Sequence, residues 1–412
     1  MVRIDRREKI NSLLAAAVIA ETNVCAITSA FVTIPMVSVL LMAAILASCL
    51  FINGKRIQLA PQSTIAFILF GILLVFSMLI NGFEVAGERF LYFITFGFTA
   101  MMVVSVRQNP RLILKYLLYI YAVHLIVYFL FQRNAMLDAE DYWYVQMGIA
   151  YGFVPPVIIS FIYLLYRKKL EEEGVLSHRR LIQVTLLASI FIVSAYVFLI
   201  DCGTRGVIVV AFVGIFFICI RKLSRKQRLI LGLGGGALLI FLYINWDTIL
   251  VSSLDRFSEG NVKSLVKLSQ MTESGDVSNG RESHYNVAIS MIKDSPIIGY
   301  GVGHFENVVK ASYVHQLFLE LLLECGIIGM ILFLIPIIRL IRKTKNDPDD
   351  INYSFKVFLL SCCFLPLMFS ASFWLYPPFW YGYFYATNLG YKQSLKRFPS
   401  NNIIKYEHSQ QV

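Results

Sequence analysis

The stretch GRESHYNVAISMIKDSPIIGYGVGHFENVVKASYVHQLFLELLLECGIIG, residues 280–329, contains the transition that decides the fold. It opens with Arg281 in a polar segment, passes through a glycine-rich turn, reaches His315 and continues as an apolar run. Apolar runs of about 18 residues or more are typical of membrane-spanning helices. The stretch therefore predicts a polar loop that ends at a membrane surface, with a basic and a titratable residue beside the membrane.

The composition of the whole chain indicates a polytopic α-helical membrane protein. Of its 412 residues, 57% are hydrophobic and only 15% are charged, whereas about 25% of the residues in a soluble domain are charged. A β-barrel would show alternating segments of about ten residues instead. The net charge of +11 is high enough to suggest nucleic acid, but the positions of Lys and Arg favour membrane topology, and we expect no nucleic-acid partner.

Twelve apolar runs predict about twelve transmembrane helices in an all-α fold. The chain then divides into an N-terminal bundle of about nine spans (1–245), a large helical loop outside the cytoplasm (246–315), C-terminal spans (316–391) and a cytoplasmic tail (392–412). The expected spans are 11–30, 31–52, 61–80, 89–106, 111–131, 147–166, 181–200, 205–220, 228–245, 316–341, 353–372 and 374–391.

The distribution of basic residues predicts the orientation. If the N-terminus is cytoplasmic and the spans alternate, 28 of the 37 Lys and Arg residues fall in cytoplasmic segments, as the positive-inside rule requires. Shifting the topology by one span would place RKKLEEEGVLSHRR and RKLSRKQR outside. We therefore expect both termini in the cytoplasm and the large loop on the opposite side of the membrane.

Within the loop, the segment after TESGDVSNG predicts a helix over 281–294 that ends before Pro296. Arg281, His284 and Tyr285 would share one face of this helix, at positions i, i+3 and i+4. The following glycines at 299, 301 and 303 predict a tight reversal. The segment before the break, 247–271, is expected to form one or two further helices.

Three residues carry the hypotheses about chemistry. Arg205, between Thr204 and Gly206 at the start of a span, is either an arginine that reaches the membrane interface or half of an anion site. Arg281 is either a solvated loop residue or a functional one. His315 is either a hydrogen-bonding anchor or a catalytic residue. His284 and His304 are weaker candidates.

Other polar and aromatic features favour structural roles. Glu320 and Glu324 lie four residues apart inside an apolar span, where they either hydrogen-bond to other spans or face a cavity. The glycines at 232–236 indicate close helix packing. The aromatic run at 373–385 predicts an interfacial belt and the wall of a lipid groove. The seven cysteines contain no CxxC pair and the loop has no DxD motif, so we expect no metal and no other cofactor.

The order of these motifs resembles the superfamily of O-antigen ligases and O-antigen polymerases. The resemblance rests on TRG at 204–206, on an arginine before a loop helix, on DSPIIGYGVG at 294–303, and on YVHQLFLELLLECGIIG at 313–329. Gln316 departs from the pattern, because Asn or Ser is expected after the histidine.

The resemblance implies an all-helical membrane glycosyltransferase, like those of the GT-C type, acting in lipopolysaccharide or other surface-polysaccharide synthesis. It would lie in the plasma membrane of a bacterium, with the large loop on the periplasmic or extracellular side. Its donor would be a glycan on undecaprenyl diphosphate. Arg205 and Arg281 would hold the diphosphate and His315 would assist the acceptor hydroxyl, while Thr204, Tyr285 and His284 would contribute to substrate binding. The reaction would need no metal and would invert the anomeric centre.

The residues do not distinguish a polymerase, whose acceptor is another lipid-linked repeat unit, from a ligase, whose acceptor is lipid A–core. We favour the polymerase, with membrane lipids and a chain-length regulator protein as further partners. A flippase is a third alternative, although the sequence shows no inverted repeat of the kind that transporters carry.

Overall fold

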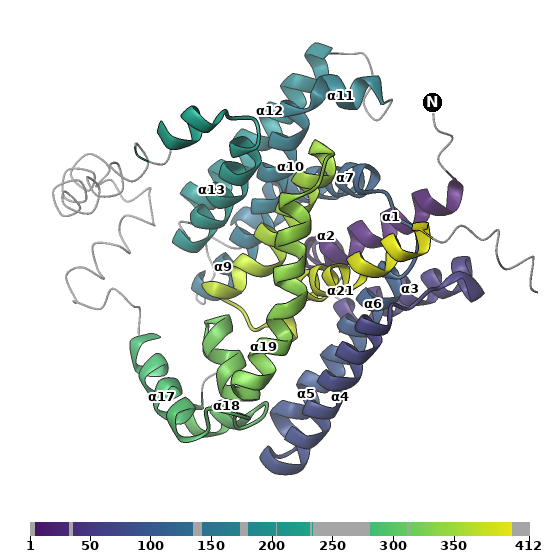
Figure 1. Cartoon of the computed structure of the whole chain (residues 1–412). Coiled ribbons are helices and arrows are strands. Elements are labelled where there is room, and N and C mark those ends of the chain that lie inside the picture. The colour runs from purple at the N-terminus through teal and green to yellow at the C-terminus, as the bar shows by residue number, and fades with distance from the viewer. Residues whose placement is uncertain are drawn as a thin grey trace, which may run out of the picture.

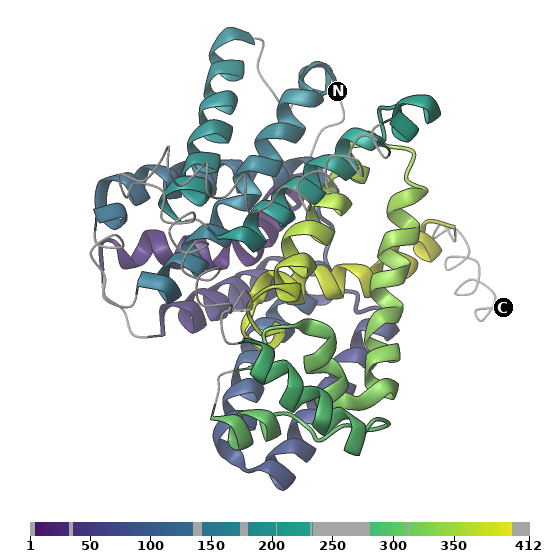
Figure 2. The ribbon, with the colours of Figure 1, turned by 90° about the vertical axis from the view of Figure 1, so that its left-hand side faces the viewer.

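The structure, a computed structural model, describes residues 5–32, 36–134, 142–173, 180–202, 204–230, 233, 281–310 and 313–397. Side chains are described for all of these except 55, 142–146, 180, 200, 205 and 390–397. The described residues form helices without strands (Figures 1 and 2). This confirms the predicted all-α class.

The α-helices are α1 (Arg6–Ile19), α2 (Glu21–Ser29), α3 (Val37–Asn53), α4 (Pro61–Asn81), α5 (Phe83–Tyr92), α6 (Thr99–Val104), α7 (Pro110–Val127), α9 (Tyr142–Gly152), α10 (Val154–Leu165), α11 (Arg167–Glu172), α12 (Arg180–Tyr196), α13 (Arg205–Ile220), α17 (Arg281–Asp294), α18 (His304–Val309), α19 (Leu317–Lys345), α20 (Asp350–Leu359) and α21 (Pro377–Arg397). Four π-helical segments extend or join them, at Phe93–Phe98, Tyr128–Gln132, Val197–Asp201 and Leu360–Phe364. Short 3-10 turns lie at Gly54–Arg56, Leu365–Met368 and Phe373–Leu375.

Seven helices in the described residues are long and apolar enough to cross a membrane. They are Pro61–Asn81, Phe83–Val104, Pro110–Gln132, Met147–Leu165, Leu181–Leu199, Leu317–Lys345 and Asp350–Met368. A bent pair, Arg6–Ile19 and Glu21–Ser29, would make eight, while Val37–Asn53 and Gly206–Ile220 are shorter apolar helices. The chain is therefore a multi-pass membrane protein, but the predicted number of twelve spans is not confirmed.

Two of the predicted spans need comment. The first, 11–30, is not one straight helix, because α1 and α2 meet at an angle of 78° where Glu21 and Asn23 bring buried polar side chains into the apolar run. The ninth, 228–245, lies almost wholly outside the described residues, as do the predicted helices before Gly280.

Helix starts follow local sequence signals. Pro110 begins α7, with Asn109 as N-cap accepting a hydrogen bond from the Arg111 amide at 3.0 Å. Asp349 caps α20 and accepts hydrogen bonds from Ile351 and Asn352 at 3.0 and 2.8 Å. Such caps satisfy backbone N–H groups that have no partner inside the helix.

The bundle core is aromatic, and here one sequence prediction was wrong. The run at 373–385 is not an interfacial belt, because Phe373, Trp374, Phe379 and Trp380 are fully buried. Phe379 stacks on Phe333 of α19 with ring centroids 5.5 Å apart. Between helices inside a bilayer, close packing of this kind replaces the hydrophobic effect as the source of stability.

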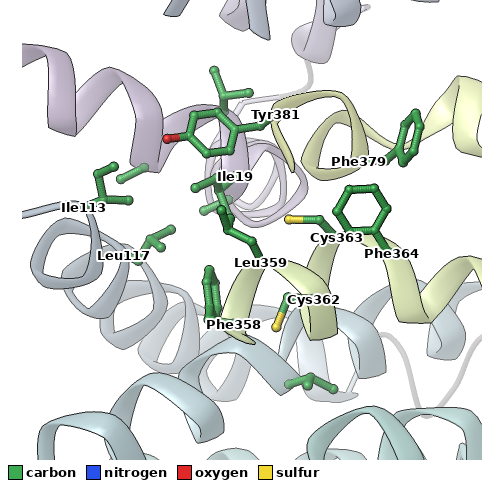
Figure 3. Packing of buried hydrophobic residues seen from close by; sticks show 14 of the residues in the cluster. Ile19, Ile113, Leu117, Phe358, Leu359, Cys362, Cys363, Phe364, Phe379 and Tyr381 are labelled. Atoms are coloured by element: carbon green, nitrogen blue, oxygen red, sulfur yellow. The ribbon is translucent and has the colours of Figure 1, made fainter. Parts of the chain in front are cut away.

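A second part of the core joins the ends of the chain. Figure 3 shows Ile19 of α1, Leu117 of α7 and Leu359 of α20 converging with Tyr381 of α21. The C-terminal helix is thus packed among the first helices of the bundle, which fixes the short segment before it, residues 369–376, against helices from both halves of the chain.

Ion pairs show that four polar segments lie at one end of the bundle. Arg111, at the start of α7, binds Glu173 after α11 at 2.5 Å and Asp349 before α20 at 3.0 Å. Arg221, at the end of α13, binds Asp350 at 2.6 Å. These segments are among those predicted to share the cytoplasmic side, so the structure agrees that they share a side.

Candidate functional site

The glycine-rich turn is fastened to a break in α19. Gly326, with φ 60° and ψ −168°, interrupts the helix, and the loop supplies replacement backbone partners. Tyr300 N–H and Gly301 N–H donate to the Leu323 and Glu324 carbonyls at 2.7 and 2.9 Å. In return, Ile327 N–H donates to the Pro296 carbonyl at 2.9 Å. We call this arrangement, residues 296–301 against 323–328, the backbone clamp.

Helix α4 holds the other side of the same turn. Asn81 Nδ2 donates to the carbonyls of Tyr300 and Val302 at 2.9 and 3.1 Å. The Val302 amide donates to Ser77 Oγ at 2.9 Å. Gly299, Gly301 and Gly303 all have positive φ, a region that costs glycine little. The predicted reversal is confirmed, and its position is fixed by two spans.

The loop helix α17 is anchored by a small core of its own. Ala288 of α17 and Phe305 of α18 are buried with Val314 and Leu323, and Tyr285 packs against them. Figures 1 and 2 show α17 and α18 lying beside the first half of α19. This packing sets the position of the first residue of α17, Arg281.

Arg281 reaches the segment before α21. Its Nη1 donates to the Phe369 carbonyl at 2.6 Å. The Phe369 side chain lies against the start of α13, since a Cβ built on Gly206 would be 3.0 Å from Phe369 Cβ. The structure therefore brings Arg281 close to the backbone of the TRG motif from a position 75 residues away in the sequence. The Arg205 side chain itself lies outside the described residues.

His315 stands at the entry to α19 in an unusual backbone conformation. Its φ is +63°, which is uncommon for a residue with a side chain, and its ring lies 4.1 Å from the Tyr313 ring. Burial, the positive charge of Arg281 and the neighbouring His284 together lower the pKa of His315 to about 4. His315 is thus neutral at pH 7, and it lies close enough to Arg281 and His284 of α17 for their charges to act on it.

Two imidazole nitrogens of this cluster have no partner within the described residues. The Nδ1 atoms of His284 and His315 are both buried without a hydrogen bond. Buried polar atoms are normally paired, and an exception calls for an explanation such as a catalytic role or a ligand. By contrast, His304 stacks on Tyr300 with ring centroids 4.5 Å apart, next to the backbone clamp.

The remaining predicted residues are placed as follows. Thr204 is the N-cap residue of α13, and its hydroxyl donates weakly to the Cys202 carbonyl at 3.5 Å. Tyr285 shares a face of α17 with Arg281 and His284 but packs into the loop core. Roles of these residues in substrate binding stay predictions.

The segment just before the TRG motif is held in place by an ion pair that the sequence did not reveal. Arg133 holds Asp201 in two hydrogen bonds, from Nε at 2.8 Å and from Nη2 at 2.9 Å. Tyr128 adds a third hydrogen bond to Asp201 at 3.1 Å. Asp201 ends a π-helical segment, a feature often found near functional sites, and the pair fixes the chain just before Thr204.

Glu320 and Glu324 have the structural partners that the sequence allowed. Ser372 Oγ donates to Glu320, and Trp374 Nε1 donates to Glu324 at 2.9 Å. Both carboxylates therefore hold the segment before α21, the same segment that accepts Arg281. A further contact between Arg89 and Glu306, at 3.9 Å, joins α5 to α18.

The sequence missed three contributors. They are the Phe369 carbonyl, Tyr313 and Tyr151, the last of which lies against Gly206 at the start of α13. A tyrosine in an apolar span or a backbone carbonyl has no distinctive sequence signal, and only the convergence of α9, α13, α17 and residues 369–372 reveals them.

One cavity of about 480 Å³ lies on a different side of α19, between α19, α4 and α21. It is mainly apolar, with Arg339 and Gln62 at one end and Ile298 of the loop at the other. Tyr383 lines it, and the lipid-groove wall at this place stays a prediction. Among the described residues, no group of three or more His, Cys, Asp and Glu side chains could hold a metal ion.

The fold and the site define a multi-pass membrane protein whose helical loop places an arginine beside a neutral histidine at one end of the bundle. Residues 189–334 match the family profile described as O-antigen ligase. This part of the chain thus carries an O-antigen ligase family domain, which supports the O-antigen polymerase and ligase superfamily and an activity of that general type. Comparison with curated proteins gave no match.

Proposed function

We propose that the protein is a surface-polysaccharide polymerase. It joins repeat units carried on undecaprenyl diphosphate, on the extracytoplasmic side of the bacterial plasma membrane, with inversion and without a metal. The observation that carries this proposal is the meeting of Arg281, His284 and His315, in which a neutral imidazole stands beside a guanidinium.

Each residue has one chemical task. The neutral His315 removes the proton from the acceptor hydroxyl, and that oxygen attacks the anomeric carbon of the donor glycan. The bond from this carbon to the diphosphate breaks, and its electron pair leaves with the diphosphate. Arg281, together with Arg205, stabilises the negative charge that develops on this leaving group. Attack opposite the leaving group inverts the anomeric centre.

The local electrostatics supports this assignment of roles. A histidine with a pKa of about 4 is unprotonated at neutral pH, so it does not repel Arg281 and is ready to accept a proton. Bound diphosphate would offset the charge of Arg281 and raise the basicity of His315. The donor would thus prepare the base that its own reaction requires.

The test uses purified protein and lipid-linked repeat units. We expect Arg281→Ala and His315→Ala to abolish glycan extension, whereas Lys293→Ala, on the exposed part of the same helix α17, leaves it intact. Full activity in both site variants would refute the proposal.

The product identifies the acceptor. Long chains on undecaprenyl diphosphate support the polymerase, and transfer only to lipid A–core supports the ligase. Activity that survives EDTA supports the metal-free reaction, while restoration by one divalent ion counts against it.

A further inference from the structure

Tyr151 occupies a position next to the proposed donor site that no sequence motif indicated. It lies near the end of α9 and is half-buried. A Cβ built on Gly206 would stand 2.5 Å from the Tyr151 hydroxyl oxygen, which is closer than two such atoms can approach. The absence of a side chain at Gly206 therefore leaves the space that the Tyr151 hydroxyl occupies, at the first turn of α13.

The Arg281 guanidinium acts on this hydroxyl from the loop helix. Its positive charge favours negative charge at this place, whereas Tyr313 opposes it. Tyr151 is only half-buried, and its hydroxyl makes no hydrogen bond to another described residue. Among the described residues, Arg281 makes one hydrogen bond, to the Phe369 carbonyl, and a guanidinium has five N–H donors. Several donors near Gly206 are thus available to a ligand.

We infer that the Tyr151 hydroxyl, which lies beside Gly206, donates a hydrogen bond to the diphosphate of the donor lipid. This inference rests on the proposed function and deepens it, because it adds a neutral donor to the two arginines. A phenol suits this place, since it contributes a hydrogen bond to the departing phosphate without adding a third positive charge next to His315.

The same geometry explains the glycine of the TRG motif. A methyl group at position 206 would displace the Tyr151 hydroxyl or press on Phe369, whose Cβ would be only 3.0 Å away. Movement of Phe369 would also shift the carbonyl that orients Arg281. Gly206 and Tyr151 should therefore act as one unit, which a double-mutant cycle can detect.

The first experiment compares Tyr151→Phe with the wild-type protein and with Tyr119→Phe, a control in an exposed tyrosine of α7. The three proteins are assayed for glycan extension, and inhibition is measured with undecaprenyl diphosphate and, separately, undecaprenyl monophosphate. We expect kcat/KM and the affinity for undecaprenyl diphosphate each to fall about 10- to 100-fold in Tyr151→Phe, as for loss of a hydrogen bond to a charged group. Tyr119→Phe should match the wild type.

The monophosphate arm separates recognition of the diphosphate from recognition of the lipid. We expect Tyr151→Phe to lose less affinity for the monophosphate than for the diphosphate. An equal loss for both lipids, with a lowered melting temperature, would show a structural role and overturn the inference. Unchanged affinity for undecaprenyl diphosphate would also overturn it. Inorganic pyrophosphate serves as a third probe, and competition by it alone would assign the site to a free phosphate compound.

The second experiment makes Gly206→Ala and the double variant with Tyr151→Phe. We expect the double variant to lose no more activity than the worse single variant, because both changes remove the same hydrogen bond. Multiplicative losses would contradict the inference. If Arg281→Ala stays fully active while Tyr151→Phe still weakens diphosphate binding, the proposed reaction fails and the binding site stands.

Discussion

The two polar ends of the bundle differ in how far their polar groups are paired with one another. At one end, Arg111, Glu173, Asp349 and Lys169 form a network in which every charge faces an opposite charge within 3.0 Å. At the other end, Arg281 stands beside two histidines whose buried Nδ1 atoms have no partner within the described residues. A network whose groups satisfy one another holds helices together and leaves nothing for a ligand.

The pKa values express the same contrast. The pKa of Asp349 is about 2, because the Asn352 amide, Lys169 and Arg111 outweigh the effect of burial. The pKa of His315, about 4, is likewise below its ordinary value, but here the causes are burial and the positive charge of its neighbours. Surroundings at Asp349 favour its charged form, whereas those at His315 favour its neutral form. The first suits an ion pair, and the second suits a base awaiting an anionic substrate.

The largest expected effects are at the two site residues, Arg281 and His315. In the proposed reaction, replacement of Arg281 by Ala removes charge stabilisation from the leaving group, and single residues in this role contribute about 10²- to 10³-fold to kcat. We expect a loss of at least that size in extension of lipid-linked repeat units, with the melting temperature within a few degrees of the wild type. Lys293→Ala provides the matched control. Comparable activity in both variants would show that Arg281 has no special role in the reaction, and the proposed functional difference between the two ends would fail.

His315→Ala should lower kcat by about 10²- to 10⁴-fold, the usual contribution of a general base. In the wild type, the acid limb of kcat/KM that belongs to His315 should lie near pH 4 and not near 6.5, because its pKa is lowered in the free protein. Activity should therefore persist as the pH falls from 7 to 5. A limb centred on pH 6.5 would show that Arg281 and His284 do not act on this imidazole. His304→Phe, which keeps a ring next to Tyr300, is the control.

Much of this organisation could be predicted from the sequence. Apolar runs about as long as a bilayer is thick gave most of the helices, and the loop helix begins at Arg281 as its polar pattern and Pro296 indicated. The glycines at 299, 301 and 303 gave the reversal. These features depend on local chemistry, which a single segment carries.

The remaining features depend on contacts between distant segments. Nothing in the apolar run after His315 distinguishes Gly326 as a helix break, because its partners are loop carbonyls and amides some 25 residues earlier. The burial of Trp374 and Trp380 likewise follows from packing against Phe70 and Phe93, and the aromatic composition alone equally suited an interface. Tyr151 belongs to the site only because α9 and α13 are neighbours.

The next largest effect on stability and activity is expected from a substitution in the backbone clamp. In Gly326→Ala the new Cβ would overlap the Ile297 carbonyl, and alanine would be strained at φ 60°. We expect about 1–3 kcal/mol less stability, the typical cost of such a conformation, together with reduced activity as the loop moves. Thermal unfolding and glycan extension measure the two effects. Gly71→Ala is the control, because its Cβ would have ordinary contact at 3.9 Å from Phe93. Equal stability in both variants would show that the clamp does not hold the loop.

The smallest expected effect is at the paired end. Lys169→Ala removes one partner of Asp349 while Arg111 remains, and partly exposed ion pairs contribute only about 0.2–1 kcal/mol. Because the folded-state pKa of Asp349 is below its ordinary value, its contribution is complete above pH 4 and is lost as the pH falls from 4 towards 2. The variant should therefore melt slightly earlier at pH 7, match the wild type near pH 2, and extend glycans at the wild-type rate. Loss of activity without loss of stability would mean that this network also serves the reaction, and the division of labour between the two ends would fail.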